Sequence, residues 1–264
     1  MWTDFFRSRR AGDLLLALVV VKPLVTIPAI RQRISTGAMI GAVPSVVLAG
    51  DAQFMITVIG TLKGGSGKST LAFNLGVWLA MADVDVQLID ADPQATLSDV
   101  CDVRVEEQFE PRILVRERSA LTKEALLEHE ETLIDIGTAD MDALRTSLAL
   151  CDRVVVPVPP SQADIWSTQR FVHLVRSIDS EIRPDVIGFI NRGDTHHAVR
   201  ETNEAAAALV ALPDIRYIKP RLSQRTVFRR SFSEGLAVFE LEPNGKGAKE
   251  FYALAAALFP HLLS

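Results

Sequence analysis

A glycine-rich stretch, TLKGGSGKST at residues 61–70, joins a short apolar run, ITVIG, to the helical pattern STLAFNLGVWLA. Gly64, Gly65 and Gly67 let backbone N–H groups approach an anion closely, and the helix that follows directs the positive end of its dipole to the same place. A strand, a glycine-rich turn and a helix in this order predict a phosphate-binding loop at the edge of a sheet. An ordinary strand-to-helix turn is the alternative interpretation.

The side chains of this loop match the roles that nucleotide chemistry requires. Lys68 is placed to reach the β- and γ-phosphates, the Ser69 hydroxyl to bind Mg²⁺, and Thr70 to hydrogen-bond the α-phosphate. The common pattern G-x-x-x-x-G-K-[ST] would need a glycine at the position of Leu62. The chain instead has a second lysine, Lys63, directly before the glycine pair.

From Met55 onward, short apolar runs alternate with longer helical patterns, which predicts repeated β–α units and a parallel sheet. We expect strands at residues 56–61, 86–90, 112–116, 132–136, 153–158, 185–191 and 214–218. We expect helices near residues 68–82, 122–130, 140–149, 163–179, 198–211, 222–233 and 246–259. This pattern predicts one α/β domain over residues 55–264, a doubly wound and mainly parallel sheet flanked by helices.

Residues 1–54 differ from the rest in charge. They carry a net charge of +3, whereas the whole chain carries −5. Their apolar run at residues 14–21 ends at Lys22 and Pro23, so it is too short to span a bilayer, and no convincing signal-peptide cleavage site follows. Because the first predicted strand begins directly at Met55, we expect this leader to be a disordered tail or non-native upstream sequence. A membrane-associating appendage is the alternative.

Polar side chains follow three further predicted strands. Asp90 and Asp92 end the second strand in LIDADPQAT, Asp135 ends the run TLID, and Asn191 follows VIGFI. Ligands bind at the carboxyl ends of parallel strands, and paired carboxylates there suit Mg²⁺ binding and the orientation of an attacking water. Simple strand-ending turns are the alternative interpretation of Asp90, Asp92 and Asn191.

A basic segment begins within the last predicted strand and continues beyond it. Residues 215–233 contain six basic side chains and no acidic one. Arg221, Arg225 and Arg229 recur every fourth residue, which predicts three guanidinium groups on one helix face, with Arg230 beside them. On an acidic protein this favours contact with a DNA backbone. A solvated face, or a dimer rim paired with acidic residues, is the alternative.

The pattern K-G-G-x-G-K-[ST]-[ST] at residues 63–70 resembles the deviant Walker A loop of the ParA/MinD family of ATPases, and DADPQ matches that family's D-x-D-P-Q motif. The resemblance implies ATP and Mg²⁺ as ligands and a homodimer that forms in the ATP state. It implies that Lys63 reaches the partner subunit's nucleotide, where it stabilises charge on the transferred phosphoryl group.

The resemblance also assigns roles to single residues. It implies that Asp92 positions the attacking water, that Asp90 lies nearer the metal, and that Asp135 holds the Mg²⁺ shell through water. It implies that Asn191 reads adenine and that Arg192 flanks the base. The predicted catalytic residues are therefore Lys63, Lys68 and Asp92, and the metal residues Ser69, Asp90 and Asp135. The predicted nucleotide contacts are Gly64, Gly65, Ser66, Gly67, Lys68, Ser69, Thr70, Asn191 and Arg192.

The chain is most similar to small ParA-type partition ATPases. That similarity implies a cytoplasmic, nucleoid-associated switch whose ATP dimer binds DNA without sequence preference. A ParB-like centromere-binding or activator protein would stimulate slow ATP hydrolysis, and the cargo would be a plasmid, a chromosome region or a protein assembly. The basic segment supplies the predicted DNA contacts.

Three alternatives keep this fold. A metabolic ligase of the dethiobiotin-synthetase or cobyrinate-amidase type needs a substrate pocket that no motif reveals. An electron-transfer ATPase similar to the nitrogenase iron protein needs cluster-binding cysteines, whereas we expect Cys101 and Cys151 to be reduced core residues. A MinD-like membrane-associated ATPase needs a basic amphipathic tail, and the final helical pattern lacks one, so we expect that helix to pack in the core.

Overall fold

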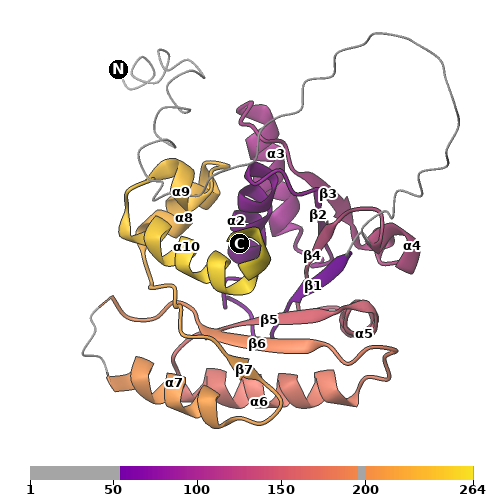
Figure 1. Ribbon diagram of the computed structural model, residues 1–264, viewed down its shortest axis with the longest axis vertical. Coiled ribbons are helices and arrows are strands. Elements are labelled where there is room, and N and C mark those ends of the chain that lie inside the picture. The colour runs from indigo at the N-terminus through magenta and orange to yellow at the C-terminus, as the bar shows by residue number, and fades with distance from the viewer. Residues whose placement is uncertain (1–53, 196–199, 264) are drawn as a thin grey trace, which may run out of the picture. The chain divides into compact units, whose positions relative to one another are not determined.

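The computed structural model describes residues 54–195 and 200–263, so the predictions for the leader lie outside the described part of the chain. Seven parallel strands form one sheet in the order β3-β2-β4-β1-β5-β6-β7 (Figure 1). The strands are β1 (Met55–Ile59), β2 (Val86–Asp90), β3 (Leu114–Glu117), β4 (Glu131–Asp135), β5 (Arg153–Val158), β6 (Asp185–Ile190) and β7 (Arg216–Tyr217). The predicted parallel α/β fold is therefore confirmed.

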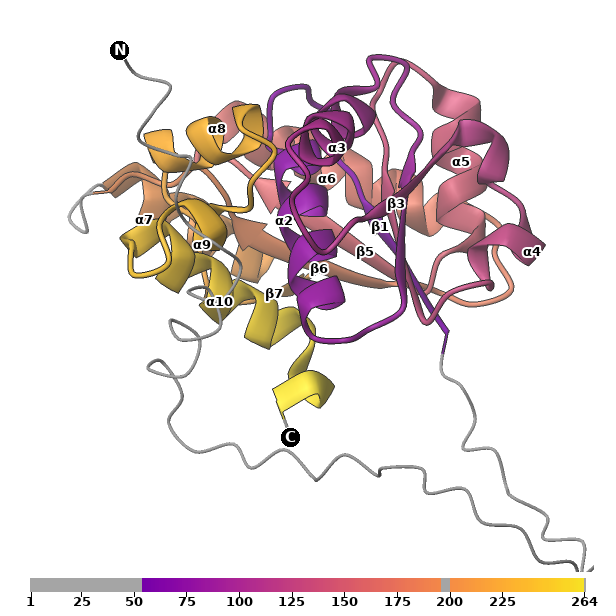
Figure 2. The ribbon, with the colours of Figure 1, turned by 90° about the horizontal axis from the view of Figure 1, so that it is seen from above.

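Helices cover both faces of the sheet. One hydrophobic cluster lies under α2 (Lys68–Met81), α3 (Thr96–Glu106), α8 (Thr226–Ser233), α9 (Val238–Leu241) and α10 (Lys246–Leu258). The other lies under α4 (Lys123–Leu126), α5 (Met141–Leu150), α6 (Gln162–Ser177) and α7 (Arg200–Ala211). Figure 2 shows α8, α9 and α10 gathered beside α2.

Strand side chains feed both clusters alternately, because successive residues of a strand point to opposite faces. In β1, Val58 belongs to the second cluster and Ile59 to the first, and both are completely buried. In β2, Leu88 and Ile89 divide in the same way. Burial on both faces explains why the strands read as continuous apolar runs rather than as alternating patterns.

The strand order collects the candidate site at one edge. β1 lies between β4 and β5, so the loop that leaves its carboxyl end emerges near the centre of the sheet. Asp90 and Asp135 pair in register at the ends of β2 and β4. The residues predicted for phosphate and metal binding therefore come from neighbouring strand ends, as expected for this class of sheet.

Two helices of the structure are absent from the predictions. The helix α3 was not predicted, although Leu97, Val100, Cys101 and Arg104 are its buried residues at helical spacing. An arginine at the fourth apolar position conceals the pattern; Arg104 is only 1% exposed and binds Glu240 through two hydrogen bonds of 2.8 Å. The short helix α9, which carries Glu240, was also not predicted.

The structure also bears on the predictions for the final helix and the two cysteines. The final helix α10 packs in the core through residues such as Phe251 and Leu254, as predicted. Cys101 and Cys151 are buried in different clusters, and burial raises the pKa of each thiol to about 12. No helix within residues 54–195 and 200–263 has the length and apolar character needed to cross a bilayer.

Candidate nucleotide-binding site

The loop after β1 takes a shape that only its glycines permit. Gly65 and Gly67 have φ angles of 72° and 91°, in the left-handed region that side chains disfavour. A Cβ atom on Gly67 would come within 2.6 Å of Asn191 Nδ2. The Thr61 hydroxyl donates to the Lys63 carbonyl at 2.8 Å and lies 3.1 Å from Ser66 Oγ, so the loop is also held by its own side chains.

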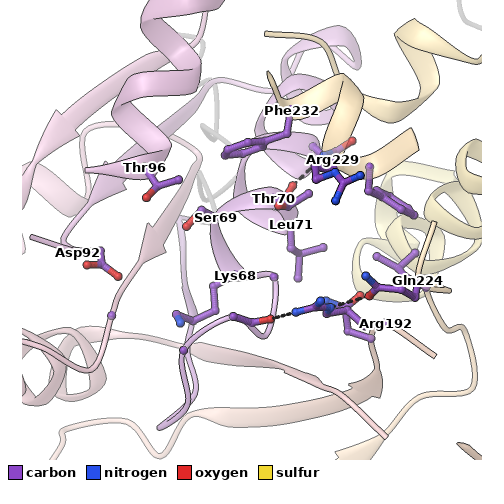
Figure 3. Close-up of a pocket in the computed structure, with 18 of the residues that line it drawn as sticks. Lys68, Ser69, Thr70, Leu71, Asp92, Thr96, Arg192, Gln224, Arg229 and Phe232 are labelled. Atoms are coloured by element: carbon purple, nitrogen blue, oxygen red, sulfur yellow. Dashed lines mark hydrogen bonds between the residues drawn. The ribbon is translucent and has the colours of Figure 1, made fainter. Parts of the chain in front are cut away.

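This loop opens onto a cavity of about 500 Å³ at the start of α2. Figure 3 shows Lys68, Ser69 and Thr70 on one side of the cavity and the α8 residues Arg229 and Phe232 on the other. The residues of the predicted site that line it are Gly64, Gly65, Gly67, Lys68, Ser69, Thr70, Asp92, Asn191 and Arg192. Ser66, within the same loop, is buried and does not line the cavity.

Asp135 has the properties of a ligand for a cation or for a cation's water shell. It is completely buried at the end of β4, and neither carboxylate oxygen accepts a hydrogen bond of normal geometry from the described residues. Burial raises its pKa to about 7, although the nearby Ser69 hydroxyl and Lys68 ammonium act in the opposite direction. A buried carboxylate whose oxygens accept no well-formed hydrogen bond is costly, so this site fits Mg²⁺, which uses few protein ligands together with phosphate oxygens.

Asp90 is occupied differently. Its Oδ2 accepts hydrogen bonds from the Ser98 backbone N–H at 2.8 Å and from the Ser98 hydroxyl at 2.9 Å, and its Oδ1 accepts from the Asp92 N–H at 3.2 Å. These bonds fix the first turn of α3 against the end of β2. Asp90 therefore shapes the D-x-D turn, and its approach to the metal stays a prediction.

Asp92 lines the cavity, and its position depends on a glycine that was not predicted as part of the site. A Cβ atom on Gly137, just beyond β4, would lie 2.1 Å from Asp92 Oδ2. Only glycine therefore leaves room for this carboxylate. The signal was present in the sequence, because Gly137 follows the predicted metal strand within TLIDIG.

Asn191 and Arg192 hold the loop rather than standing free in the cavity. Asn191 Nδ2 donates to the Ser66 carbonyl at 2.6 Å. The Arg192 guanidinium donates to the Gly65 carbonyl and, through Nε, to Gln224 Oε1 at 2.6 Å (Figure 3). One amide hydrogen of Asn191 is thus committed to the loop, and its predicted contact with adenine stays a prediction. Gln224 was not predicted.

The expected single face of arginines is wrong. The helix α8 begins only at Thr226, because Arg225 has extended backbone angles and Leu222 and Gln224 bond to the segment after β6. Arg225 pairs with Glu250 of α10 at 2.6 Å, and the same carboxylate accepts from Ser223.

The three arginines therefore do not share a helix face, and each lies in a different setting. Arg221 lies upstream of α8, and Arg225 precedes its first residue. Arg229, within α8, lines the cavity, and the exposed Arg230 lies 3.7 Å from Glu242 and 4.0 Å from Glu234.

Lys63 does not line the cavity of its own chain. Its ammonium instead lies 2.9 Å from Asp164 Oδ1, in the first turn of α6. Asp164 was not predicted as part of the site. Its sequence signal is the pair Ser161 and Asp164 at the spacing of an N-terminal capping motif.

The chain resembles known proteins over most of its length. The family model described as "CobQ/CobB/MinD/ParA nucleotide binding domain" matches residues 56–238. The maintenance of carboxysome distribution protein A of Halothiobacillus neapolitanus is 24% identical over 200 residues, which are 73% of this chain and 90% of that protein.

Two solved structures share the fold at low identity. A putative plasmid partition protein from Borrelia burgdorferi bound to AMPPNP has a TM-score of 0.63 and 18% identity, with 79% of this chain and 100% of that chain covered. The septum site-determining protein MinD from Pyrococcus horikoshii, complexed with Mg-ADP, has a TM-score of 0.61 and 18% identity, with 78% and 96% covered.

Proposed function

The chain belongs to the CobQ/CobB/MinD/ParA nucleotide-binding domain family, and on that premise we propose that it is an ATP-hydrolysing switch of the partition or positioning kind. One observation carries the proposal: the cavity joins the loop glycines, the Lys68 ammonium and the Asp92 carboxylate, and the buried Asp135 near Lys68 accepts no hydrogen bond of normal geometry from the described residues. Two similar proteins are a carboxysome-distribution protein and a putative plasmid partition protein. Their named functions favour partition or positioning over a metabolic ligase or an electron-transfer ATPase.

The residues divide the work of hydrolysis. Lys68 and the loop N–H groups would bind the triphosphate, and Ser69 and Asp135 would hold Mg²⁺ with its water shell. Bound Mg²⁺ supplies positive charge that offsets charge on the transferred phosphoryl group. Asp92 accepts a hydrogen bond from the attacking water and orients it for in-line attack, in the space that Gly137 leaves open.

The proposed active form is a homodimer. Lys63 stands outside the cavity of its own chain, so it is available to a triphosphate bound to a second copy. There its ammonium stabilises the charge that develops on the γ-phosphoryl group. In an isolated subunit, Lys63 lies outside the cavity and does not assist hydrolysis. Hydrolysis therefore depends on association of two subunits.

We propose that Asp92→Ala separates binding from hydrolysis. ATP turnover should fall about 100-fold, because the water loses its orienting carboxylate, whereas nucleotide affinity should change little. The measurement is phosphate release beside fluorescence titration with a labelled ATP analogue. Asp99→Ala, in α3 and outside the cavity lining, is the matched control. Equal loss of binding and turnover in Asp92→Ala would contradict the assigned role.

DNA binding by the ATP dimer, a ParB-like stimulating partner and nucleoid association form the finer part of the proposal. Arg230→Ala is the cleaner test of DNA contact, because Arg230 is exposed and does not line the cavity, whereas loss of Arg225 would unpair Glu250 and loss of Arg229 would change the cavity. ATP-dependent retention on DNA should fall several-fold at low salt. Unchanged retention would remove this surface from the proposal.

Two further measurements distinguish the alternatives. Phosphate release that depends on a small carboxylic acid substrate would indicate a metabolic ligase. Binding to anionic vesicles would indicate a MinD-like protein, although the apolar face of α10 is already packed in the core.

A further inference from the structure

We propose that Arg118 is a positioning residue for ATP hydrolysis. Through its ion pair with Asp140, it keeps the segment of residues 136–140 in place beside the cavity. The inference rests on the proposed function, and it concerns how accurately Asp92 can orient the attacking water. Neither Arg118 nor Asp140 lines the cavity, so their effect on the reaction is indirect.

The two carboxylate oxygens of Asp92 differ in what surrounds them. Oδ1 accepts a hydrogen bond from the Gln94 backbone N–H at 3.0 Å, whereas Oδ2 accepts none from the described residues. Oδ2 is also the atom that would lie 2.1 Å from a Cβ atom on Gly137. The backbone of Gly137 therefore bounds the oxygen that is available to the water, and a shift of this backbone would change the position of that oxygen.

The segment of residues 136–140, which joins β4 to α5, is bonded at its ends and not between them. At its start, the Asp135 carbonyl accepts a hydrogen bond from the Ala91 N–H at 2.9 Å. Residues 137–139 line the cavity and form no hydrogen bond with the described part of the chain. The position of Gly137 therefore depends on how firmly the two ends of the segment are held.

Asp140 holds the far end of the segment with both of its carboxylate oxygens. Oδ1 accepts hydrogen bonds from the backbone N–H groups of Asp142 at 3.1 Å and of Ala143 at 2.9 Å, so it caps α5. Oδ2 pairs with the Arg118 guanidinium. The Asp140 side chain is 14% exposed, whereas that of Arg118 is 57% exposed. The cap orients Asp140 on its own helix, and Arg118 connects it to another part of the molecule.

Arg118 comes from the part of the sheet that also carries Asp92. It begins the short 3₁₀ helix η1 (Arg118–Ala120), which directly follows the edge strand β3. β3 pairs with β2, with Glu117 opposite Asp90, and Asp92 lies just beyond the end of β2. The ion pair therefore ties the end of the segment after β4 to the strands that position Asp92, and it fixes Gly137 relative to the water-orienting carboxylate.

An ordinary surface ion pair is the alternative interpretation, since most exposed pairs contribute little. The chain offers a matched comparison on the same strand. Arg116 Nη2 lies 2.5 Å from Glu128 Oε2, both side chains are partly exposed, and neither residue lines the cavity. If Arg118 were only a surface cation, its loss would affect ATP turnover no more than the loss of Arg116.

The experiment is steady-state phosphate release by the full 264-residue chain with Mg²⁺ and ATP. Arg118→Ala should lower kcat about three- to tenfold, because a small misplacement of the attacking water slows hydrolysis, whereas KM for ATP should stay within about twofold. Arg118→Lys keeps the positive charge and should recover part of the rate. Arg116→Ala should match wild type. With an active wild type, an unchanged kcat in Arg118→Ala, or an equal loss in Arg116→Ala, would overturn the inference and leave the proposed function standing.

Asp140→Asn tests the same contact from its other side. The amide oxygen retains the cap of α5, but the charge that pairs with Arg118 is lost. Its kcat should fall as in Arg118→Ala, and the double variant should lose no more than either single variant, because both remove one interaction. The melting temperatures of all three should stay near that of wild type. Fully additive losses of kcat would show that the two residues act separately and would contradict the proposal.

A measurement without nucleotide separates failure of this inference from failure of the proposed function. In the ¹⁵N NMR spectrum of the nucleotide-free chain, the backbone amide signals of residues 137–139 should shift in Arg118→Ala and stay in place in Arg116→Ala. Unchanged signals in Arg118→Ala would refute the hold that Arg118 exerts, whatever the turnover. A wild-type chain that binds ATP but releases no phosphate would refute the proposed function and, with it, the positioning role.

Discussion

The two sides of the cavity differ in how their cations are held. On the side of α2, Lys68 is 7% exposed and forms no ion pair with the described residues. On the side of α8, Arg225 already has a bidentate partner in Glu250. A buried cation that forms no ion pair is available to an anionic ligand, whereas a cation held by a carboxylate stabilises the fold.

This comparison explains why the number of basic residues in the sequence does not predict which cations on the α8 side can bind a ligand. Arg104, Arg153 and Arg225 all bind carboxylates of distant segments, and the first two are almost completely buried. Positive charge counted along the chain therefore overstates what is available to a ligand. The useful property is an unpaired cation that faces the cavity.

The comparison predicts its largest effect at Lys68. Lys68→Ala should lower ATP turnover about 100- to 1000-fold, because the phosphates lose the buried ammonium that faces them. Phosphate release at saturating ATP measures this. Lys219→Ala, which removes an exposed lysine, should behave as wild type. Turnover within tenfold of wild type in Lys68→Ala would show that the α2 side does not bind the phosphates.

The α2 side was predictable because its geometry follows from consecutive residues. The order strand, glycines, lysine and hydroxyl fixes the positions of Gly67, Lys68 and Ser69 through local backbone shape and the start of a helix. Asp90 and Asp135 were predictable as neighbours because both end strands of a parallel sheet, and their register pairs them directly.

The α8 side was not predictable because its geometry depends on contacts distant in the chain. The helix starts at Thr226 since the residues before it bond to the segment after β6, and Glu250, 25 residues from Arg225, takes that guanidinium. The arginines do recur at every fourth residue of the sequence. This spacing does not describe a helix face, because two of the three arginines lie before the first residue of α8.

A smaller effect on stability is expected from the paired arginine. Arg225→Ala should lower the free energy of unfolding by about 1–2 kcal/mol, because Glu250 loses its charged hydrogen bonds while retaining those from Ser223. Urea denaturation measures this, and nucleotide affinity should stay within about twofold. Arg230→Ala, whose acidic neighbours lie at 3.7 and 4.0 Å, should change stability by less than about 0.5 kcal/mol. Equal losses in both variants would remove the distinction between a paired and an exposed arginine.

The smallest effect should come from Arg229, the exception on the α8 side. Its side chain faces the cavity near Thr70 (Figure 3), and its guanidinium has no ion-pair partner among the described residues. By the reasoning that distinguishes Lys68 from Arg225, Arg229 should contact the nucleotide. Because the residue is exposed, Arg229→Ala should weaken binding of a labelled ATP analogue only about three- to tenfold, without loss of stability.

The control for Arg229→Ala is Arg229→Lys, which keeps the charge and should recover part of the affinity. Higher salt should reduce the difference between wild type and Arg229→Ala, since an exposed cation is screened. If DNA retention fell in Arg229→Ala while nucleotide affinity stayed at the wild-type value, Arg229 would serve DNA rather than the cavity. An unpaired cation lining a pocket would then not suffice to identify a ligand contact, and the contrast between the two sides would apply to buried cations alone.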